Sequence, residues 1–194
     1  MRDQTTFACF RGSAVSGRYE TFVSAVAFRS LIVFDLDNTL IHSVPEQVAG
    51  APFQTFPVDM GGENGVWQVY IRPHIFDFFK LLEDLDVPYA VWTAGDEQYA
   101  EWIVKGLKQH GKFVPRFVWA RGKTTVTPDG EHVKDMRKIR RYKKAVLLDD
   151  SEHHKRYFEN QQRVQVVPGF YATVARDDFF KTLSQLTVKV LNAR

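Results

Sequence analysis

Two carboxylates, Asp35 and Asp37, stand one residue apart directly after a short apolar run. Residues 31–34 are all apolar, which is typical of a strand buried on both faces of a parallel sheet. Ligand sites in open α/β sheets lie just beyond the carboxyl ends of such strands. Two ionised carboxylates this close repel each other. An Asp-x-Asp sequence alone is common in solvated turns, but at a buried strand end it indicates a site for a divalent cation.

Two later apolar runs end in polar residues in the same way. Residues 89–92 lead into Thr93, and residues 145–148 lead into Asp149 and Asp150. Parallel neighbours bring their carboxyl ends to one edge of a sheet, so we expect these groups to gather at the end of the first strand. The sequence therefore predicts one polar crevice assembled from three distant segments.

The rest of the chain alternates strand and helix patterns, which predicts an α/β fold. We expect a doubly wound, Rossmann-like, mostly parallel sheet with helices on both faces, a β-hairpin insertion after the first core strand and no separate cap domain. The expected helices are 73–85, 96–110 and 177–191, and the further strands are 54–59, 66–72, 116–119 and 164–167. A second, smaller hairpin is expected near 128–130, and a short polar helix after residue 150.

Composition and charge fit one enzyme-sized domain, with 44% hydrophobic residues in a chain of 194. The formal net charge of +3 is too small to indicate a nucleic-acid binder by itself. Basic residues crowd the stretch 134–144, which we interpret as a solvated face, with an anionic partner as the second interpretation. The single cysteine, Cys9, excludes an internal disulfide framework, and no apolar run is long enough to predict a membrane span. An intracellular location follows, in the nucleus or the cytoplasm.

The separated motifs together resemble those of the haloacid dehalogenase superfamily. More narrowly, they resemble the phosphatases of the RNA polymerase II C-terminal domain and their NLI-interacting-factor relatives. The matching segments are 35–43, 71–73, 92–95 with Tyr99, 133–136 and 148–151. The resemblance covers about residues 31–192, so we predict an N-terminal extension over 1–30 and a haloacid-dehalogenase-like phosphatase domain over 31–194. The extension is expected to pack on the domain or to stay mobile.

This resemblance implies a phosphatase that works through an aspartyl-phosphate intermediate. Asp35 is the expected nucleophile, because an ionised carboxylate needs no separate base. Asp37 is expected to protonate the leaving group and then to take a proton from water. Thr93 and Lys134 are expected to donate hydrogen bonds to phosphoryl oxygens, where negative charge accumulates. The implied substrate is phosphoserine or phosphothreonine in a protein or peptide.

The resemblance also implies a Mg²⁺ cofactor and the residues around it. The expected ligands are the carboxylates of Asp35 and Asp150 and the backbone carbonyl of Asp37. Asp149 is expected to orient Lys134 from outside the ligand set. The side chains expected to contact the substrate are Tyr99 and Arg121. The chain departs from the family pattern at Asn38, His74, Asp150 and Glu152, which leaves the substrate preference open.

Two other functions remain open from the sequence. The same chemistry could act on nucleic-acid ends or small phosphate esters, and the basic stretch 134–144 would suit a nucleic-acid backbone. A non-catalytic adaptor could keep the fold, although it would not need a repulsive carboxylate pair. The sequence leaves the oligomeric state open.

Two further patterns have competing interpretations. Phe53, Phe56 and Val58 could line an apolar groove beside the site or pack the hairpin against the sheet. His153 and His154 could suggest a metal site, but adjacent side chains on a helix diverge, so we expect a solvent-facing pair.

Overall fold

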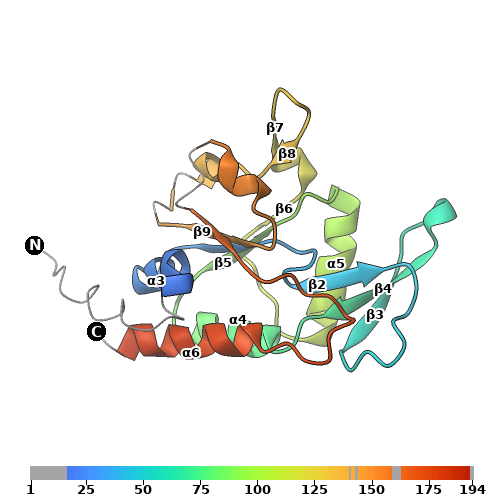
Figure 1. Cartoon of the computed structure of the whole chain (residues 1–194), viewed down its shortest axis with the longest axis horizontal. Helices are drawn as coiled ribbons and strands as arrows, with labels where there is room; N and C mark the ends of the chain where they lie inside the picture. Colours follow the sequence, from blue (N-terminus) through green and yellow to red (C-terminus); the bar gives the residue numbers. More distant parts are fainter. Residues whose placement is uncertain (1–16, 140, 143, 159–162, 193–194) are drawn as a thin grey trace, which may run out of the picture.

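A five-stranded parallel sheet forms the centre of the protein (Figure 1). The computed structural model describes residues 17–139, 141–142, 144–158 and 163–192. Every strand pairing within the sheet is parallel. The strand order is β10 (Val164–Val166), β9 (Val146–Asp149), β1 (Ile32–Phe34), β5 (Tyr89–Trp92) and β6 (Val118–Trp119). The predicted α/β class with a parallel sheet is confirmed, and the strand order reverses on either side of β1, where a doubly wound sheet places its ligands.

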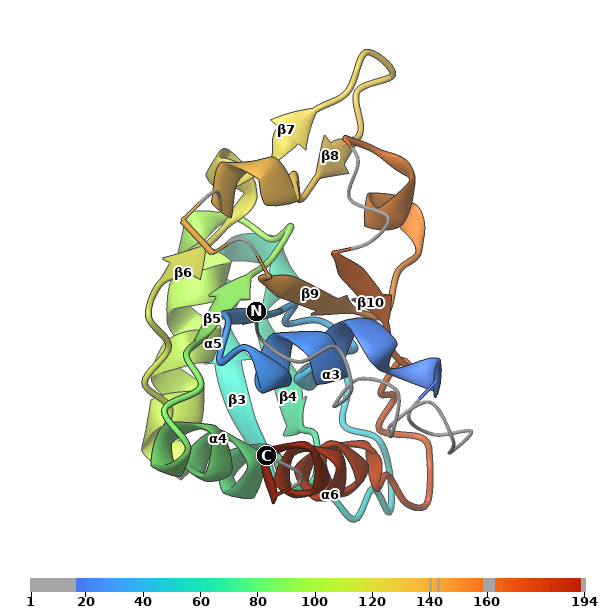
Figure 2. The ribbon, with the colours of Figure 1, turned by 90° about the vertical axis from the view of Figure 1, so that its left-hand side faces the viewer.

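One face of the sheet packs against α-helices whose apolar residues recur at helical spacing. The helices are α3 (Glu20–Ala27), α4 (Ile75–Asp84), α5 (Glu97–His110) and α6 (Phe179–Asn192), and all four contribute to one buried cluster with Ile32 and Phe34. Phe34 meets the rings of Phe78 and Phe79 edge to face. Figure 2 shows α3, α4 and α6 on the same side of the sheet. Residues 17–30 of the predicted extension therefore pack on the domain through α3, and residues 1–16 lie outside the described residues.

The opposite face of the sheet is covered, among the described residues, by a second and smaller apolar cluster. Leu31 and Val33 of the first strand segment point to this side and join a second buried cluster. Its covering residues include Met136 and Ile139 from the 3₁₀-helix η3 (Met136–Ile139). Helical structure therefore flanks both faces. Among the described residues of this second cluster, the helical cover comes from the short η3 and not from an α-helix.

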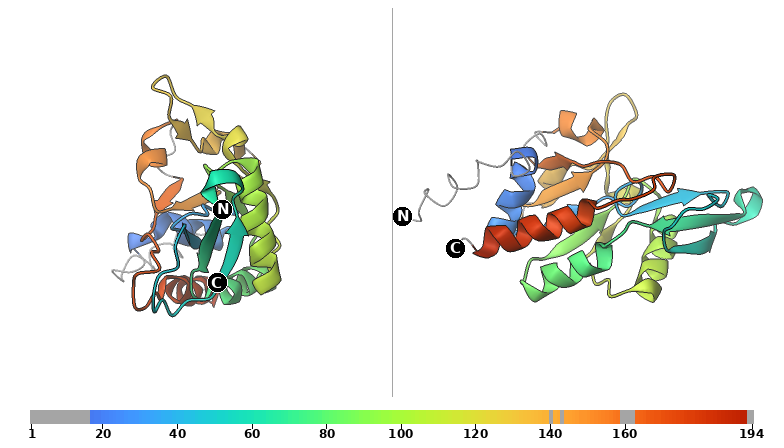
Figure 3. Two further views of the ribbon diagram at one scale, coloured as in Figure 1. Left: turned by 90° about the vertical axis from the view of Figure 1, so that its right-hand side faces the viewer. Right: turned by 60° about the horizontal axis from the view of Figure 1, so that its bottom comes forward.

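A three-stranded antiparallel sheet projects beyond the first core strand (Figure 3). Its order is β2 (Ile41–Val44), β4 (Val66–Ile71) and β3 (Thr55–Asp59), with the turn η1 (Gly62–Asn64) between β3 and β4. The predicted hairpin is present, and β2 is an additional strand. The smaller predicted hairpin is β7 (Thr125–Val126) and β8 (His132–Val133), which follows η2 (Arg121–Lys123). Another 3₁₀-helix, η4 (His153–Arg156), follows β9.

A buried arginine connects the antiparallel sheet to the turn after β1. Arg72 follows β4 and forms two hydrogen bonds to Asp177, at 3.0 and 2.9 Å. It also donates to the Thr39 carbonyl at 3.1 Å, and its guanidinium lies 4.3 Å from the ring centre of Phe179. Because a bidentate arginine has a fixed geometry, these contacts hold the turn that carries Asp37 against the start of α6. In the part of the chain that the structure describes, no helix combines the length and apolar character needed to cross a bilayer.

Candidate active site

Three carboxylates converge at the carboxyl end of the parallel sheet. Asp35 directly follows β1, and Asp149 is the last residue of the neighbouring strand β9. The Asp35 amide donates to the Leu148 carbonyl at 3.0 Å, so the hydrogen bonds between β1 and β9 extend as far as Asp35. One oxygen from each of Asp35, Asp149 and Asp150 lies within 4.8 Å of the others. The structure thus brings Asp150 to Asp35, as the parallel arrangement of their strands predicts.

A buried lysine bridges two of these carboxylates. The Nζ of Lys134 lies 2.5 Å from Asp35 Oδ1 and 2.7 Å from Asp149 Oδ2, and its side chain is 1% exposed. Burial alone would lower the pKa of Lys134, but the Asp149 and Asp35 carboxylates outweigh it and raise the pKa above its ordinary value. The ammonium is therefore charged at neutral pH. Burial also opposes ionisation of Asp149, yet Lys134 holds the pKa of that carboxyl below its usual range.

Asp37 occupies a tight turn between β1 and β2. The turn is closed by the amides of Leu40 and Ile41, which both donate to the Leu36 carbonyl. Asn38 has a φ of 54°, a left-handed conformation that asparagine adopts more readily than most residues. These features direct the Asp37 side chain back toward the sheet, where it receives hydrogen bonds from Tyr99 and Thr93.

The environment of Asp37 favours its protonated form. Burial raises the pKa of Asp37 above its ordinary value, although the Tyr99 hydroxyl, Lys134 and Thr93 act in the opposite direction. Tyr99 lies on the first turns of α5, which is capped by the Asp96 side chain accepting from the Tyr99 amide at 2.8 Å. The Tyr99 and Ser43 hydroxyls are also 2.9 Å apart. Tyr99 is therefore fixed from both ends beside Asp37.

The environment of Asp35 also opposes its ionisation. Burial raises its pKa well above the ordinary value, and the charges of Asp149 and Asp37 raise it further against the opposing effect of Lys134. Asp150 likewise has a raised pKa because of burial and its neighbour Asp149. Four carboxyl groups, those of Asp35, Asp37, Asp149 and Asp150, thus lie close together. Among the described residues, Lys134 is the lysine that pairs with members of this cluster, namely Asp35 and Asp149. Oxygen ligands with excess negative charge fit Mg²⁺, which would stabilise the ionised carboxylates.

His154 belongs to this cluster, contrary to the expectation of a solvent-facing pair. Its residue exposure is 6%, and its Nε2 lies 3.4 Å from Asp149 Oδ2. The Lys134 amide approaches its Nδ1 at 3.4 Å. The two adjacent rings meet edge to face, with their centres 5.4 Å apart. His154 points inward from η4, while His153 faces Glu131 at 3.7 Å. Sequence spacing alone carries no signal for this contact, because it depends on how η4 packs beside β8.

A groove of about 490 Å³ is lined by Tyr99, whose hydroxyl donates a hydrogen bond to Asp37. Tyr99, Arg121 and Trp67 line it, together with residues of the β3–β4 turn and of α5. Arg121 is exposed, and its Nε donates to the Ala94 carbonyl at 2.8 Å. Phe56 and Val58 are instead buried in the core, and Phe53 packs on Phe170. Of the two interpretations of these apolar residues, packing is therefore correct.

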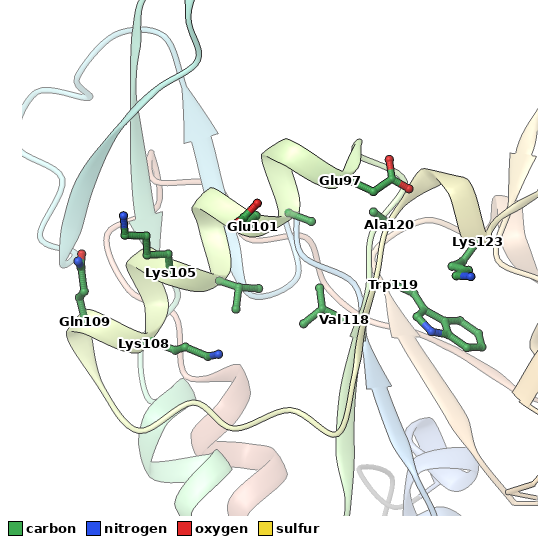
Figure 4. Close-up of a pocket in the computed structure, with 11 residues that line it drawn as sticks. Glu97, Glu101, Lys105, Lys108, Gln109, Val118, Trp119, Ala120 and Lys123 are labelled. Atoms are coloured by element: carbon green, nitrogen blue, oxygen red, sulfur yellow. The ribbon is translucent and has the colours of Figure 1, made fainter.

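A second groove, of about 640 Å³, lies between α5 and the outer strand β6 (Figure 4). Val104 and Val118 are among its apolar residues. Its rim contains the charged residues Glu97, Glu101, Lys105, Lys108 and Lys123. None of the clustered carboxylates lines this groove, and charges of both signs surround it.

The basic stretch 134–144 is only partly a solvated face. Lys134 is buried in the site, and Arg137 pairs with Asp135 at 2.9 Å. The Lys138 Nζ donates to the carbonyls of Lys123 and Thr124, each at 2.8 Å. Several cations of this stretch therefore have partners within the protein.

The sequence is similar to those of known phosphatases. Residues 30–193 match the model of the NLI interacting factor-like phosphatase family. The Carboxy-terminal domain RNA polymerase II polypeptide A small phosphatase 1 of Homo sapiens is 31% identical over 141 residues, which cover 72% of this chain and 51% of the relative. The Phosphatase Herzog of Drosophila melanogaster is 31% identical over 126 residues, covering 63% of this chain and 34% of the relative.

Solved structures support the fold. The fission yeast RNA polymerase II CTD phosphatase Fcp1 bound to beryllium fluoride superimposes with a TM-score of 0.55 at 15% identity, covering 92% of this chain and 54% of that one. The chain spans about half the length of the human small phosphatase 1 that it resembles. The family match covers most of the chain and includes each residue of the carboxylate cluster, so the chain belongs to the NLI interacting factor-like phosphatase family.

Proposed function

We propose that this protein is a Mg²⁺-dependent phosphatase that hydrolyses phosphoserine or phosphothreonine in proteins or peptides. The observation that carries this proposal is the ion-paired bridge of Lys134 between Asp35 and Asp149, with Asp37 and Asp150 beside it. A charged ammonium next to a carboxylate at a strand end suits the transfer of an anionic group to that carboxylate. The family and the names of its relatives support the same reaction.

The first step in this proposal is attack of an Asp35 oxygen on phosphorus. The bond from phosphorus to the serine or threonine oxygen breaks, and Asp37 donates its proton to the departing alkoxide. Burial raises the pKa of Asp37, which favours the protonated form that a general acid needs. In the second step, Asp37 takes a proton from water as the water oxygen attacks phosphorus. The bond from phosphorus to the Asp35 oxygen breaks and inorganic phosphate leaves. Asp35 is again an ionised carboxylate, and Asp37 again carries its proton.

The remaining residues stabilise charge and hold the cofactor. Lys134 and Thr93 would donate hydrogen bonds to the phosphoryl oxygens. The carboxylates of Asp35 and Asp150 and the carbonyl of Asp37 would hold Mg²⁺, which would neutralise phosphoryl charge when bound. Asp149 would orient Lys134. Tyr99 and Arg121 would contact the substrate through the groove that they line.

A polypeptide substrate is favoured over a nucleic acid by the basic stretch. Arg137 and Lys138 bind groups of the protein itself, which leaves fewer cations for a phosphate backbone. The experiment is a panel of phosphoserine and phosphothreonine peptides set against 3′-phosphorylated oligonucleotides, at two salt concentrations. We expect higher kcat/KM on the peptides. Higher kcat/KM on the oligonucleotides, falling steeply with salt, would replace the peptide proposal. The predicted location, nucleus or cytoplasm, stays a prediction.

Replacing Asp150 with asparagine is expected to weaken cofactor binding more than it weakens folding. The variant loses one anionic oxygen from the carboxylate cluster, so the Mg²⁺ concentration needed for half-maximal activity should rise about 10- to 100-fold. Titration calorimetry of the protein with MgCl₂ measures the same change without turnover. EDTA should abolish p-nitrophenyl phosphate hydrolysis by the wild type, and added Mg²⁺ should restore it. EDTA-resistant turnover would contradict the metal dependence, and unchanged Mg²⁺ affinity in the variant would remove Asp150 from the ligand set.

Replacing Tyr99 with phenylalanine is expected to shift the pH profile. The Tyr99 hydroxyl lowers the pKa of Asp37, so its removal should raise that pKa further. A general acid with a higher pKa stays protonated to higher pH. The alkaline limb of kcat for a phosphoserine peptide should therefore move to higher pH. A control variant, Tyr157→Phe, removes an exposed hydroxyl bonded to Asp129 and should leave the limb in place. A limb that moves to lower pH in Tyr99→Phe would contradict this role of the hydrogen bond.

A further inference from the structure

His154 joins two segments that the proposed reaction needs in a fixed relation. It lies on η4, which follows β9 and its terminal Asp149. Lys134 approaches from the other side, directly after β8. The buried imidazole contacts the Asp149 carboxylate through Nε2 and the Lys134 amide through Nδ1, each at 3.4 Å. One side chain therefore contacts both the backbone that carries the lysine and the carboxylate that binds its ammonium.

The partners of the two ring nitrogens assign one form of the imidazole. The Lys134 amide is a donor, so Nδ1 must be the acceptor and carry no proton. The Asp149 carboxylate is an acceptor, so Nε2 must carry the proton and donate it. Burial, with the neighbouring Lys134 charge, lowers the pKa of His154 to about 4, which agrees with a neutral ring.

Asp149 depends on several partners for its orientation. Its Oδ1 accepts from the Ser151 amide at 2.9 Å, and its Oδ2 accepts from Lys134 Nζ at 2.7 Å. The His154 donor meets the same Oδ2 from the η4 side. Lysine has a flexible four-carbon stem, so the position of Nζ depends on the anchoring of both its backbone and its carboxylate partners. His154 acts on the backbone and on one of these partners.

We propose that His154 is a positioning residue, whose neutral imidazole braces the Lys134 backbone and the Asp149 carboxylate and so fixes the Lys134 ammonium beside Asp35. This inference deepens the proposed function and rests on it. The imidazole does not reach the reacting atoms; it acts through Lys134. The hydrogen bond from the Lys134 amide and the ion-pair contact with Asp149 are both long, at 3.4 Å. We therefore expect a moderate effect on kcat, about 10- to 100-fold, as for residues that orient the groups of a metal site.

Three substitutions separate the two contacts. His154→Gln can keep a donor near the position of Nε2, and His154→Asn can keep an acceptor near the position of Nδ1. His154→Leu removes both. His153→Gln is the control, because His153 points to Glu131 on the outside of η4. For each protein, kcat and KM on p-nitrophenyl phosphate with Mg²⁺ and the thermal unfolding temperature are measured.

If His154 positions Lys134 in this way, its loss should change kcat much more than KM. His154→Leu should lower kcat about 10- to 100-fold with KM changed much less, because substrate binding is shared with other groups. His154→Gln should recover most of the loss, since the contact with Asp149 orients the ammonium directly. His153→Gln should match the wild type. An unchanged kcat in His154→Leu would overturn the proposal. So would equal losses in all three variants that follow their unfolding temperatures, because a purely structural role predicts that pattern.

A second measurement needs no activity. Long-range ¹H–¹⁵N correlation spectra of the wild type at neutral pH distinguish a protonated from an unprotonated ring nitrogen. We expect His154 to carry its proton on Nε2 alone; a proton on Nδ1 would overturn the brace. If the wild type lacks phosphatase activity while this tautomer is found, the proposed function has failed and the contacts of the brace stand. If activity is present with the other tautomer, the brace alone has failed.

Discussion

Replacing Asp35 with asparagine is expected to reduce the turnover of p-nitrophenyl phosphate by at least about 10⁴-fold, as losses of a catalytic nucleophile do. Asparagine keeps the shape of the side chain but its amide cannot form the phosphorylated intermediate. The folded state should persist, because the substitution also removes a buried carboxylate that Asp149 and Asp37 destabilise. Steady-state kinetics and thermal unfolding of the same preparation measure both effects.

The matched control is Asp59→Asn, which changes a carboxylate on β3 of the antiparallel sheet. It should leave kcat within about twofold, because surface substitutions away from a site have small effects. Full activity in Asp35→Asn would remove Asp35 as the nucleophile. Activity lost together with the folded structure would be no evidence for chemistry at Asp35, so the unfolding curve must accompany the rate.

Replacing Lys134 with methionine is expected to damage both activity and stability. The proposed loss of a donor to the phosphoryl oxygens should lower kcat about 10²- to 10³-fold. The Lys134 ammonium lies 2.5 Å from Asp35 and 2.7 Å from Asp149. Its removal leaves the buried negative charge of these carboxylates without that cation. This should cost about 3–5 kcal/mol in the free energy of unfolding. Kinetics and urea unfolding at neutral pH measure the two losses.

The stability loss should also depend on pH. In the wild type, Lys134 outweighs burial and holds the pKa of Asp149 below its usual range. Without Lys134, burial should raise the pKa of Asp149 in the folded state above the unfolded value. The folded variant then binds protons more tightly than the unfolded chain, so its stability should rise as pH falls from 7 toward 5. Lys138→Met, which lies in the same basic stretch, should cost about 1 kcal/mol with no such pH dependence. A Lys134→Met deficit that grows toward acidic pH would contradict the ion-pair account.

The core of the fold could be predicted from the sequence because its signals are local. Residues 31–34, 89–92 and 145–148 are apolar runs too short for helices. Asp96 caps α5 by accepting a hydrogen bond from the Tyr99 amide. Asp35, Thr93, Asp149 and Asp150 follow these runs directly, which was enough to predict that the carboxylates gather at one edge of the sheet. Parallel pairing of β1 with β5 and β9 then brings the strand ends together.

Features that depend on distant contacts could not be predicted in this way. The strand β2 exists because residues 41–44 pair with β4, and nothing in those four residues marks a strand. The helix α3 was not predicted, because polar residues surround its short apolar pattern. Its residues Phe22 and Val26 are nevertheless fully buried. His154 depends on the packing of η4 beside Lys134. In each case the neighbour that decides the structure lies outside the local sequence pattern.

The central claim, that Asp35 receives the phosphoryl group, can be tested by trapping the intermediate in Asp37→Asn with p-nitrophenyl phosphate. This leaving group needs no proton, so phosphoryl transfer should proceed while hydrolysis, which needs a base, stalls. The account predicts a burst of p-nitrophenolate equal in amount to the enzyme, with a hydroxylamine-sensitive phosphate on the peptide that contains Asp35. A phosphate on any other residue, or steady turnover with no phosphorylated peptide, would contradict it.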